Sequence, residues 1–166
     1  MKRVNAIWEH PFYQEQYQKL MMREKDRVFC RHQIEHLLNV ARIAYIYNLE
    51  QGLGIDKELI YITAILHDIG KYEQYESGTP HEIAGSRIAN HILRDLNGSQ
   101  REIRFTEKEI RQILSAILNH RRQEDVRGPL DALLYASDKR SRNCFACPAR
   151  TQCDWEEQRK NKEILI

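Results

Sequence analysis

Glycine and proline are scarce in this sequence, and their scarcity limits the folds that the chain can adopt. The 166 residues include seven glycines and four prolines, which together are about half of the usual share of about 12%. Because both residue types interrupt regular elements, this scarcity predicts long helices or strands. Hydrophobic residues make up 42% of the chain and charged residues 30%, so we expect a packed core rather than disorder.

Local signals indicate that the long elements are helices. Thr106 and Glu109 form a capping-box pattern before an apolar repeat of helical spacing, and Asp56 precedes another such repeat. No run of alternating apolar and polar residues predicts a strand. We therefore expect one all-α domain, a bundle of about six to seven helices. The expected helices cover approximately residues 9–24, 29–51, 57–70, 80–97, 107–122, 129–142 and 151–161.

Charge and hydropathy exclude several classes of protein. Lys and Arg number 26 and Asp and Glu 24, a net charge of +2, so we expect no basic arm for nucleic acid. No stretch approaches the roughly 18 apolar residues of a membrane span. The basic residues at the N-terminus lack the apolar region of a secretory signal. We expect a cytoplasmic protein without a membrane partner, in which thiols stay reduced.

Histidine and aspartate side chains recur within or at the ends of apolar helices. His67 and Asp68 follow the apolar segment 59–66, where burial of a charged pair is costly unless a cation or hydrogen bonds compensate for it. A capping histidine beside a solvated aspartate is the simpler interpretation of this pair. A divalent cation between helices would account for all such residues together. The others are His36, His81, His120 and Asp138.

The order of these residues resembles the HD-domain metal-dependent phosphohydrolase superfamily. The family pattern is a histidine, an adjacent His-Asp pair and a distal aspartate, and it is matched here by His36, His67-Asp68 and Asp138 between residues 32 and 142. The resemblance implies that these residues hold a divalent ion such as Fe, Mn, Mg, Zn or Ni. It also implies a single domain over residues 1–166, with an N-terminal helix in 1–28, an HD-type core in 29–142 and a cysteine-containing segment in 143–166.

Branches of the family with two metals carry two further histidines between the pair and the distal aspartate. His81 and His120 occupy those places here, with His91 as the alternative to His81. The resemblance implies that Asp68 bridges the two ions and that His81 and His120 complete the second site.

The implied activity is hydrolysis of a phosphate ester or anhydride, with a small nucleotide as the expected substrate. Asp68 and Lys71 are the expected catalytic residues. Two other functions stay open: an HD-type di-iron oxygenase, and a non-catalytic nucleotide or redox sensor. A homodimer also stays open.

Lys71 and Arg142 follow metal-ligand candidates by four residues, although either can be a solvated cation near a helix end. The candidates for substrate binding are Lys71, Arg142, His32 and Arg121.

Residues 32–36 also match the H-x-x-E-H pattern of inverted zinc peptidases. In that pattern two histidines lie one turn apart on a helix and a glutamate acts as the base. A peptidase would leave His67, Asp68 and Asp138 unexplained, so we prefer the phosphohydrolase. The roles of His32 and Glu35 stay open.

Three of the four cysteines form a C-x2-C-x5-C cluster. Two thiolates that are two residues apart are typical metal ligands, and the spacing is similar to part of the iron–sulfur loop of helix-hairpin-helix DNA glycosylases. Cys30 precedes His36 by six residues and Cys144 follows Asp138 by six, so Cys30 is a candidate fourth ligand if both segments are helical. Zinc, an iron–sulfur cluster and unligated thiols are the three alternatives. The cluster consists of Cys144, Cys147 and Cys153.

Overall fold

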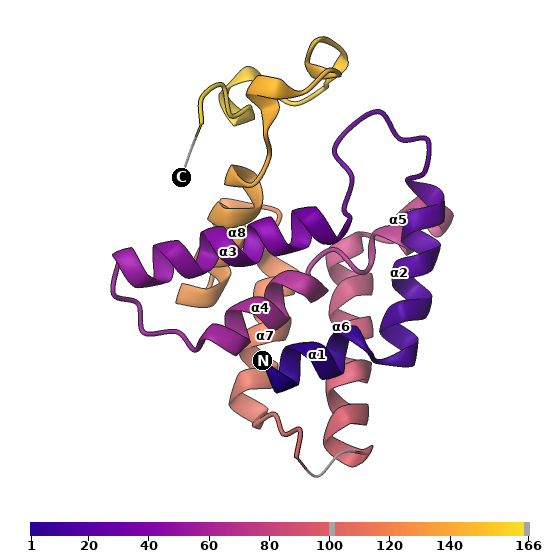
Figure 1. Ribbon diagram of the computed structural model, residues 1–166, viewed down its shortest axis with the longest axis vertical. Helices are drawn as coiled ribbons and strands as arrows, with labels where there is room; N and C mark the ends of the chain where they lie inside the picture. The colour runs from indigo at the N-terminus through magenta and orange to yellow at the C-terminus, as the bar shows by residue number, and fades with distance from the viewer. Residues whose placement is uncertain (100–101, 165–166) are drawn as a thin grey trace.

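The computed structural model describes residues 1–99 and 102–164, and this part of the chain contains eight α-helices and no strand. The all-α prediction is therefore confirmed (Figure 1). The helices are α1 (Lys2–Trp8), α2 (Pro11–Arg23), α3 (Ile34–Glu50), α4 (Lys57–Leu66), α5 (Lys71–Ser77), α6 (His81–Ser99), α7 (Glu107–Asn119) and α8 (Pro129–Arg140). Short 3₁₀ turns are η1 (Gln123–Asp125), η2 (Cys144–Ala146), η3 (Arg150–Gln152) and η4 (Glu157–Arg159).

Two expected helices have different bounds in the structure. The N-terminal segment forms α1 and α2 because Pro11 begins a new helix and the His10 ring caps it, accepting a hydrogen bond from Phe12 N at 3.2 Å. The segment expected to be helical over 57–70 ends at Leu66, and α5 begins at Lys71 after a tight turn. The helix expected over residues 9–24 therefore corresponds to α2, and the additional helix α1 was not expected.

The helix expected over residues 151–161 is also wrong. These residues contain only the turns η3 and η4. The apolar periodicity is too weak here to bury a helix face, and the segment makes local turns instead. The expected start of α3 at residue 29 moves to Ile34, so Cys30 and His32 precede the helix.

The bundle packs around α4. Seven of the ten residues of α4 are buried, as expected for a helix that is covered on all sides. It contacts α1, α3, α7 and α8, while α6 packs on α7 and α3 on α8. Figure 1 shows α4 crossing the middle of the molecule. The C-terminal end of α4 therefore lies deep in the bundle, and the His-Asp pair follows it.

Capping predictions hold at two helices. Asp56 accepts a hydrogen bond from Leu59 N at 3.0 Å, and Thr106 and Glu109 form both bonds of a capping box. These caps fix the first turns of α4 and α7. Within the described residues, no helix combines the length and the apolar character that a bilayer crossing requires.

Candidate metal centre

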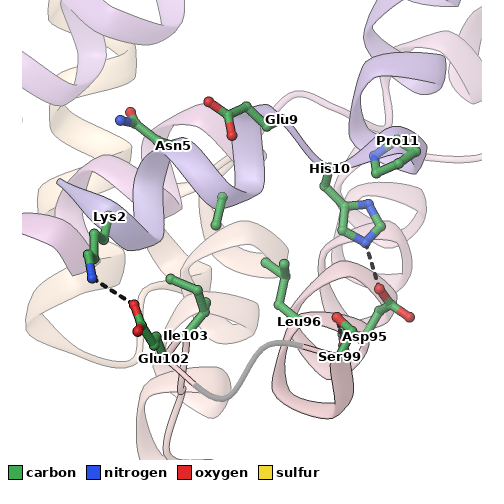
Figure 2. Close-up of a pocket in the computed structure, with 11 residues that line it drawn as sticks. Lys2, Asn5, Glu9, His10, Pro11, Asp95, Leu96, Ser99, Glu102 and Ile103 are labelled. Carbon is green, nitrogen blue, oxygen red and sulfur yellow. Dashed lines mark hydrogen bonds and ion pairs between the residues drawn. The ribbon is translucent and has the colours of Figure 1, made fainter.

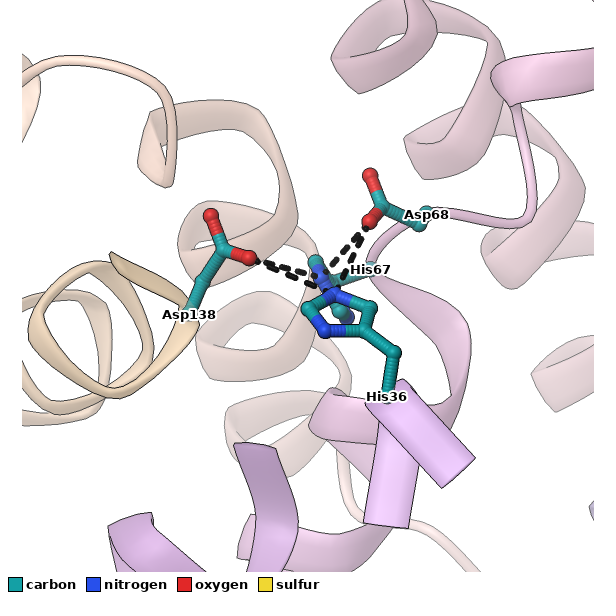
Figure 3. Close-up of side chains that lie close together, drawn as sticks. All are labelled: His36, His67, Asp68 and Asp138. Atoms are coloured by element: carbon teal, nitrogen blue, oxygen red, sulfur yellow. Dashed lines mark ion pairs between the residues drawn. The ribbon is translucent and has the colours of Figure 1, made fainter. Parts of the chain in front are cut away.

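The structure brings together all six residues that the sequence analysis selected as metal ligands. One ligand atom from each of His36, His67, Asp68 and Asp138 lies within 4.8 Å of the others. Figure 3 shows these side chains converging from α3, the end of α4 and α8. A second group of the same compactness consists of Asp68, His81 and His120.

Asp68 joins the two groups, with one carboxylate oxygen in each. Its Oδ2 lies 3.0 Å from His67 Nε2 and 3.4 Å from His36 Nε2. Its Oδ1 lies 3.4 Å from His81 Nε2 and 3.8 Å from His120 Nε2. All of these side chains are buried. Asp68 therefore contributes one carboxylate oxygen to each group.

The protons on two of the histidines are placed by backbone carbonyls. His67 Nδ1 lies 2.6 Å from Ala64 O, and His120 Nδ1 lies 2.6 Å from Ile117 O. A carbonyl oxygen only accepts, so Nδ1 is a donor on each ring, and Nε2 carries a lone pair when the ring is neutral. Each carbonyl belongs to the last turn of the helix that its histidine ends, where carbonyl groups lack intrahelical partners.

His81 is oriented in the same way by Gln74 of α5. Its Nδ1 lies 2.6 Å from Gln74 Oε1, so its Nε2 also presents a lone pair toward Asp68. This Nε2 faces His120 Nε2 at 3.0 Å. Two neutral rings with Nδ1 protonated would bring two lone pairs together at this distance, which repel each other unless a proton or a metal cation lies between them. Outer hydrogen bonds that hold Nδ1 and free Nε2 are typical of metal-ligating histidines.

A further observation supports the fit of a cation. Nε2 of His67 is fully buried and makes no hydrogen bond within the described residues, although carboxylate oxygens lie nearby. The His36 ring is oriented like those of His67 and His120. Ser141 Oγ donates to Asp138 O at 2.7 Å, so it accepts a hydrogen bond from His36 Nδ1 at 3.1 Å. The buried His/Asp cluster is compatible with a divalent metal site.

The electrostatics of the cluster favour a positive charge at its centre. Burial opposes ionisation of Asp68, but the neighbouring His67 and His32 rings hold its pKa well below the usual range. Burial likewise opposes ionisation of Asp138, yet Arg142 and Lys139 hold its pKa well below the usual range. Against burial, Asp68 and Asp138 raise the pKa of His67 to about 9, so without a metal this ring carries a positive charge, and a bound cation would displace the proton from Nε2.

The second group has less negative charge than the first. Burial, opposed by Asp68 and helped by Lys71 and His120, lowers the pKa of His81 to about 2. The His81 ring is therefore neutral at physiological pH, as a metal ligand must be. Asp68 supplies the carboxylate shared by both groups.

Two of the expected substrate-binding cations lie at the cluster. Arg142 is buried, with Nη2 3.1 Å from both Asp138 Oδ1 and His36 Nε2. Burial lowers the pKa of Lys71, which the Asp68 charge raises and the Arg142 charge lowers further. Arg121 lies on the surface, where it pairs with Glu82 at 3.0 Å.

His32 also faces the cluster, and its partner Glu24 was missed by the sequence analysis. The His32 Nε2 lies 3.8 Å from Asp68 Oδ2, while its Nδ1 is bonded to Glu24. The fully buried Glu24 also accepts hydrogen bonds from His32 N at 2.6 Å and Tyr75 Oη at 2.7 Å. Glu24 precedes His32 by eight residues on an irregular segment, so no periodic signal links the two.

The structure does not form the inverted peptidase arrangement. His32 precedes α3 and Glu35 is exposed to solvent, so the two histidines and the glutamate do not share one helical face. The alternative ligand His91 is exposed on α6 and packs against Phe12 instead. His81, rather than His91, therefore belongs to the cluster.

Two glycines allow the turn after Asp68 to approach α6. A methyl group at Gly70 would overlap the backbone of both His81 and Gly85. At Gly85 it would lie 3.4 Å from His67 O. The close approach of these backbones places His81, the first residue of α6, opposite Asp68.

A surface hollow of about 620 Å³ lies elsewhere, between the ends of α1 and α6. Figure 2 shows it beside the Lys2–Glu102 and His10–Asp95 ion pairs. Its lining contains none of the cluster residues. The chemistry of the buried cluster is therefore the stronger indication of a functional site than the volume of this hollow.

Comparisons with known proteins agree with this geometry. A family model described as HD domain matches residues 34–143. A Clostridium beijerinckii protein described as uncharacterized is 44% identical over 167 residues, 99% of each chain. Ribonuclease Y of Petrotoga mobilis is 32% identical over 121 residues, and ribonuclease Y of Aquifex aeolicus over 103. Those matches cover 72% and 61% of this chain but only 20% and 16% of the two ribonucleases.

A crystal structure described as a predicted HD superfamily hydrolase, from an uncultured Thermotogales bacterium, has a similar fold. Its TM-score is 0.62 and its sequence identity 18%, with 96% of this chain and 87% of that chain covered. The family match over residues 34–143 contains all six clustered residues, including His81 and His120. The chain belongs to the HD domain family.

Proposed function

We propose that the protein is a metal-dependent phosphohydrolase that cleaves a phosphate ester or anhydride of a small nucleotide. One observation carries the proposal: histidine Nε2 lone pairs converge on the two oxygens of Asp68, and two of them face each other at 3.0 Å. A divalent cation in each group relieves this repulsion. His36, His67, Asp68 and Asp138 would hold the first ion, and Asp68, His81 and His120 the second.

When bound, such ions act as Lewis acids that activate water and neutralise charge on a phosphoryl group. The protein supplies the orientation. The carbonyls of Ala64 and Ile117 hold the His67 and His120 rings, so the ligand atoms need no rearrangement. Asp68 keeps one negative charge between the two groups and would contribute one oxygen to each cation.

Cationic side chains beside the cluster suit a phosphorylated substrate. Arg142 is buried against Asp138, and Lys71 is close enough for both Asp68 and Asp138 to influence its pKa. A phosphate that replaced part of this carboxylate contact would accept hydrogen bonds from a guanidinium and an ammonium. His32, held by Glu24, is the nearest ring that lies outside the ligand set and would contact substrate.

The ribonuclease Y relatives support chemistry at phosphorus. Their name describes cleavage of RNA, whose linkages are phosphodiesters, and this chain aligns with about one fifth of their length. Phosphodiesters therefore belong in the substrate panel beside nucleoside monophosphates and dinucleoside polyphosphates.

The test is a turnover assay on metal-loaded protein with this panel, with and without oxygen. Product that forms without oxygen supports the phosphohydrolase. Oxygen-dependent turnover without phosphate chemistry would favour the oxygenase, and tight nucleotide binding without turnover would favour the sensor. Asp68→Asn should remove activity, while the exposed Asp26→Asn serves as the matched control. Full activity in Asp68→Asn would refute the site.

A further inference from the structure

The four cysteines of the chain lie in two segments that have almost no hydrophobic core. Residues 143–164 contain the turns η2, η3 and η4, and Ala149 is the one buried residue that this described stretch contains. Residues 25–31, which include Cys30, contain no buried residue in the structure. Segments that bury so little apolar surface need another source of order, such as a disulfide or a metal.

Disulfides do not supply that order. Cys30, Cys144, Cys147 and Cys153 are all described, and all four are free thiols at intermediate burial. Hydrogen bonds tie one end of the segment to the bundle, where Asn161 Nδ2 donates to Arg142 O at 2.7 Å and to Lys139 O at 2.9 Å. The three C-terminal cysteines lie in the stretch between Arg142 and Asn161.

The fold places the two cysteine segments at the same end of the bundle. Figure 1 shows the chain between α2 and α3 and the C-terminal segment both projecting beyond the helices on this side. Burial raises the pKa of the Cys30 thiol, Arg142 lowers it, and the Cys144 and Cys147 thiols raise it. Cys30 is thus an electrostatic neighbour of the C-terminal thiols across more than a hundred residues of sequence.

Local geometry around Cys144 also suits a metal. Cys147 N donates to Cys144 O at 3.3 Å and Arg150 N donates to Cys147 O at 3.2 Å, which forms two successive tight turns. In such a turn the Cα atoms of the first and fourth residues lie within about 7 Å, so Cys144 and Cys147 are close together. The sequence-based argument that Cys30 and Cys144 lie at equal offsets along two helices is wrong, because both lie outside α3 and α8.

We propose that Cys30, Cys144, Cys147 and Cys153 bind a four-iron–four-sulfur cluster that holds the C-terminal segment on the bundle. Four thiolates on two otherwise coreless segments supply one ligand for each iron.

The spacing of the cysteines along the sequence favours this cluster over a zinc ion. Sulfurs around tetrahedral zinc lie about 3.8 Å apart, given Zn–S bonds of about 2.3 Å. Zinc sites also tend to use two short-spaced pairs, whereas this chain has one C-x2-C pair and two separate cysteines. A cubane cluster spreads its thiolates because each binds a different iron.

Arg142 would connect the cluster with the HD centre. Its guanidinium contacts Asp138 and His36 on one side, and its charge influences the Cys30 thiol on the other. Loss of the cluster should therefore disturb a side chain at the edge of the HD centre, although the two sites share no ligand.

The test is to purify the full chain without oxygen and to measure acid-labile sulfide, iron and zinc. We expect about four sulfides per chain and absorbance near 400 nm. Cys147→Ser and Cys30→Ser should each lower sulfide at least about fivefold. Asp68→Asn is the control, because it should remove iron from the HD centre while sulfide stays unchanged. Sulfide therefore reports on the cysteines even if the proposed hydrolase activity fails.

Several outcomes would overturn the proposal: zinc without sulfide, no metal at the cysteines, or full sulfide in Cys30→Ser. If the serine variants do not accumulate, alkylation of the wild-type protein decides instead. The four thiols should resist iodoacetamide until a chelator removes the cluster, after which all four should react and residues 143–164 should become sensitive to protease. Equal alkylation before and after chelation would refute the proposal.

Discussion

The two halves of the HD centre share Asp68 but differ in charge. His36 and His67 lie beside two carboxylates, because Asp138 Oδ1 is 3.3 Å from His36 Nε2. His81 and His120 lie beside the other oxygen of Asp68, with no second carboxylate in their group. Since coulombic attraction in a buried site depends strongly on the number of charges, the Asp138 half should bind its cation first and more tightly.

The anchoring of the two halves differs as well. Each half has one histidine held by a main-chain carbonyl and one held by a side chain. The side-chain anchor of His36 is the buried Ser141, whereas that of His81 is Gln74 of α5, a helix without a buried residue. The second ion therefore depends on a side-chain contact to a short surface helix. This difference predicts a centre that is filled in sequence, and the following variants test it.

Asp138→Asn should have the largest effect, because it removes one of two charges from the tighter half while keeping the shape. We expect affinity for the first ion to fall by more than about 100-fold, with a similar loss of turnover. Titration calorimetry on metal-free protein measures the affinity. Unchanged binding of the first ion would show that the halves do not differ as proposed.

Gly70→Ala tests whether the backbone approach creates the second half. Its methyl group would overlap His81 and Gly85, so we expect a loss of about 1–3 kcal/mol of stability and a lower melting temperature by about 2–4 °C for each kcal/mol. The control is Gly98→Ala, where the added methyl group meets open space. An equal effect of both substitutions would show that the close approach is unimportant.

His120→Ala should remove the second ion alone. The metal content should fall from two ions to one, because His36, His67, Asp68 and Asp138 still supply every ligand of the first group. Metal analysis after gel filtration provides the count, and turnover should fall about 10- to 100-fold. Loss of both ions would mean that the halves cannot be filled separately.

Glu24→Gln should have the smallest effect. The amide keeps an acceptor near His32 but loses the charge, so we expect kcat/KM to fall about 10-fold while both ions stay bound. Glu35→Gln is the matched control because Glu35 is exposed at the start of α3. If the two variants have the same kcat/KM, His32 does not depend on Glu24 for its orientation.

Much of the helical core and the approximate position of each ligand could be predicted from the sequence. Asp56 and Thr106 mark helix starts through hydrogen bonds that are local in sequence, and the apolar spacing marks the buried faces. The metal-ligand candidates share the property of a polar group on or after an apolar face. That property is local, and it is sufficient to select His67 and Asp68.

The remaining features depend on contacts between distant segments. Gln74 meets His81 only because Gly70 lets the turn close on α6, and Glu24 meets His32 across a segment without periodicity. The break between α4 and α5 follows from the same close approach. One missed signal is local: His67 and His120 each bond to the carbonyl three residues earlier, as a histidine that ends a helix can.

The orientation of two rings at the HD centre, His81 and His32, depends on the short helix α5. None of its seven residues, all of them described, is buried, yet Lys71, Gln74 and Tyr75 act on the carboxylates, on His81 and on Glu24. A helix with so little buried surface opens at a small free-energy cost compared with α4. Its amide hydrogens should exchange far sooner than those of the core, and each opening would release the restraints on His81 and His32 in a single event.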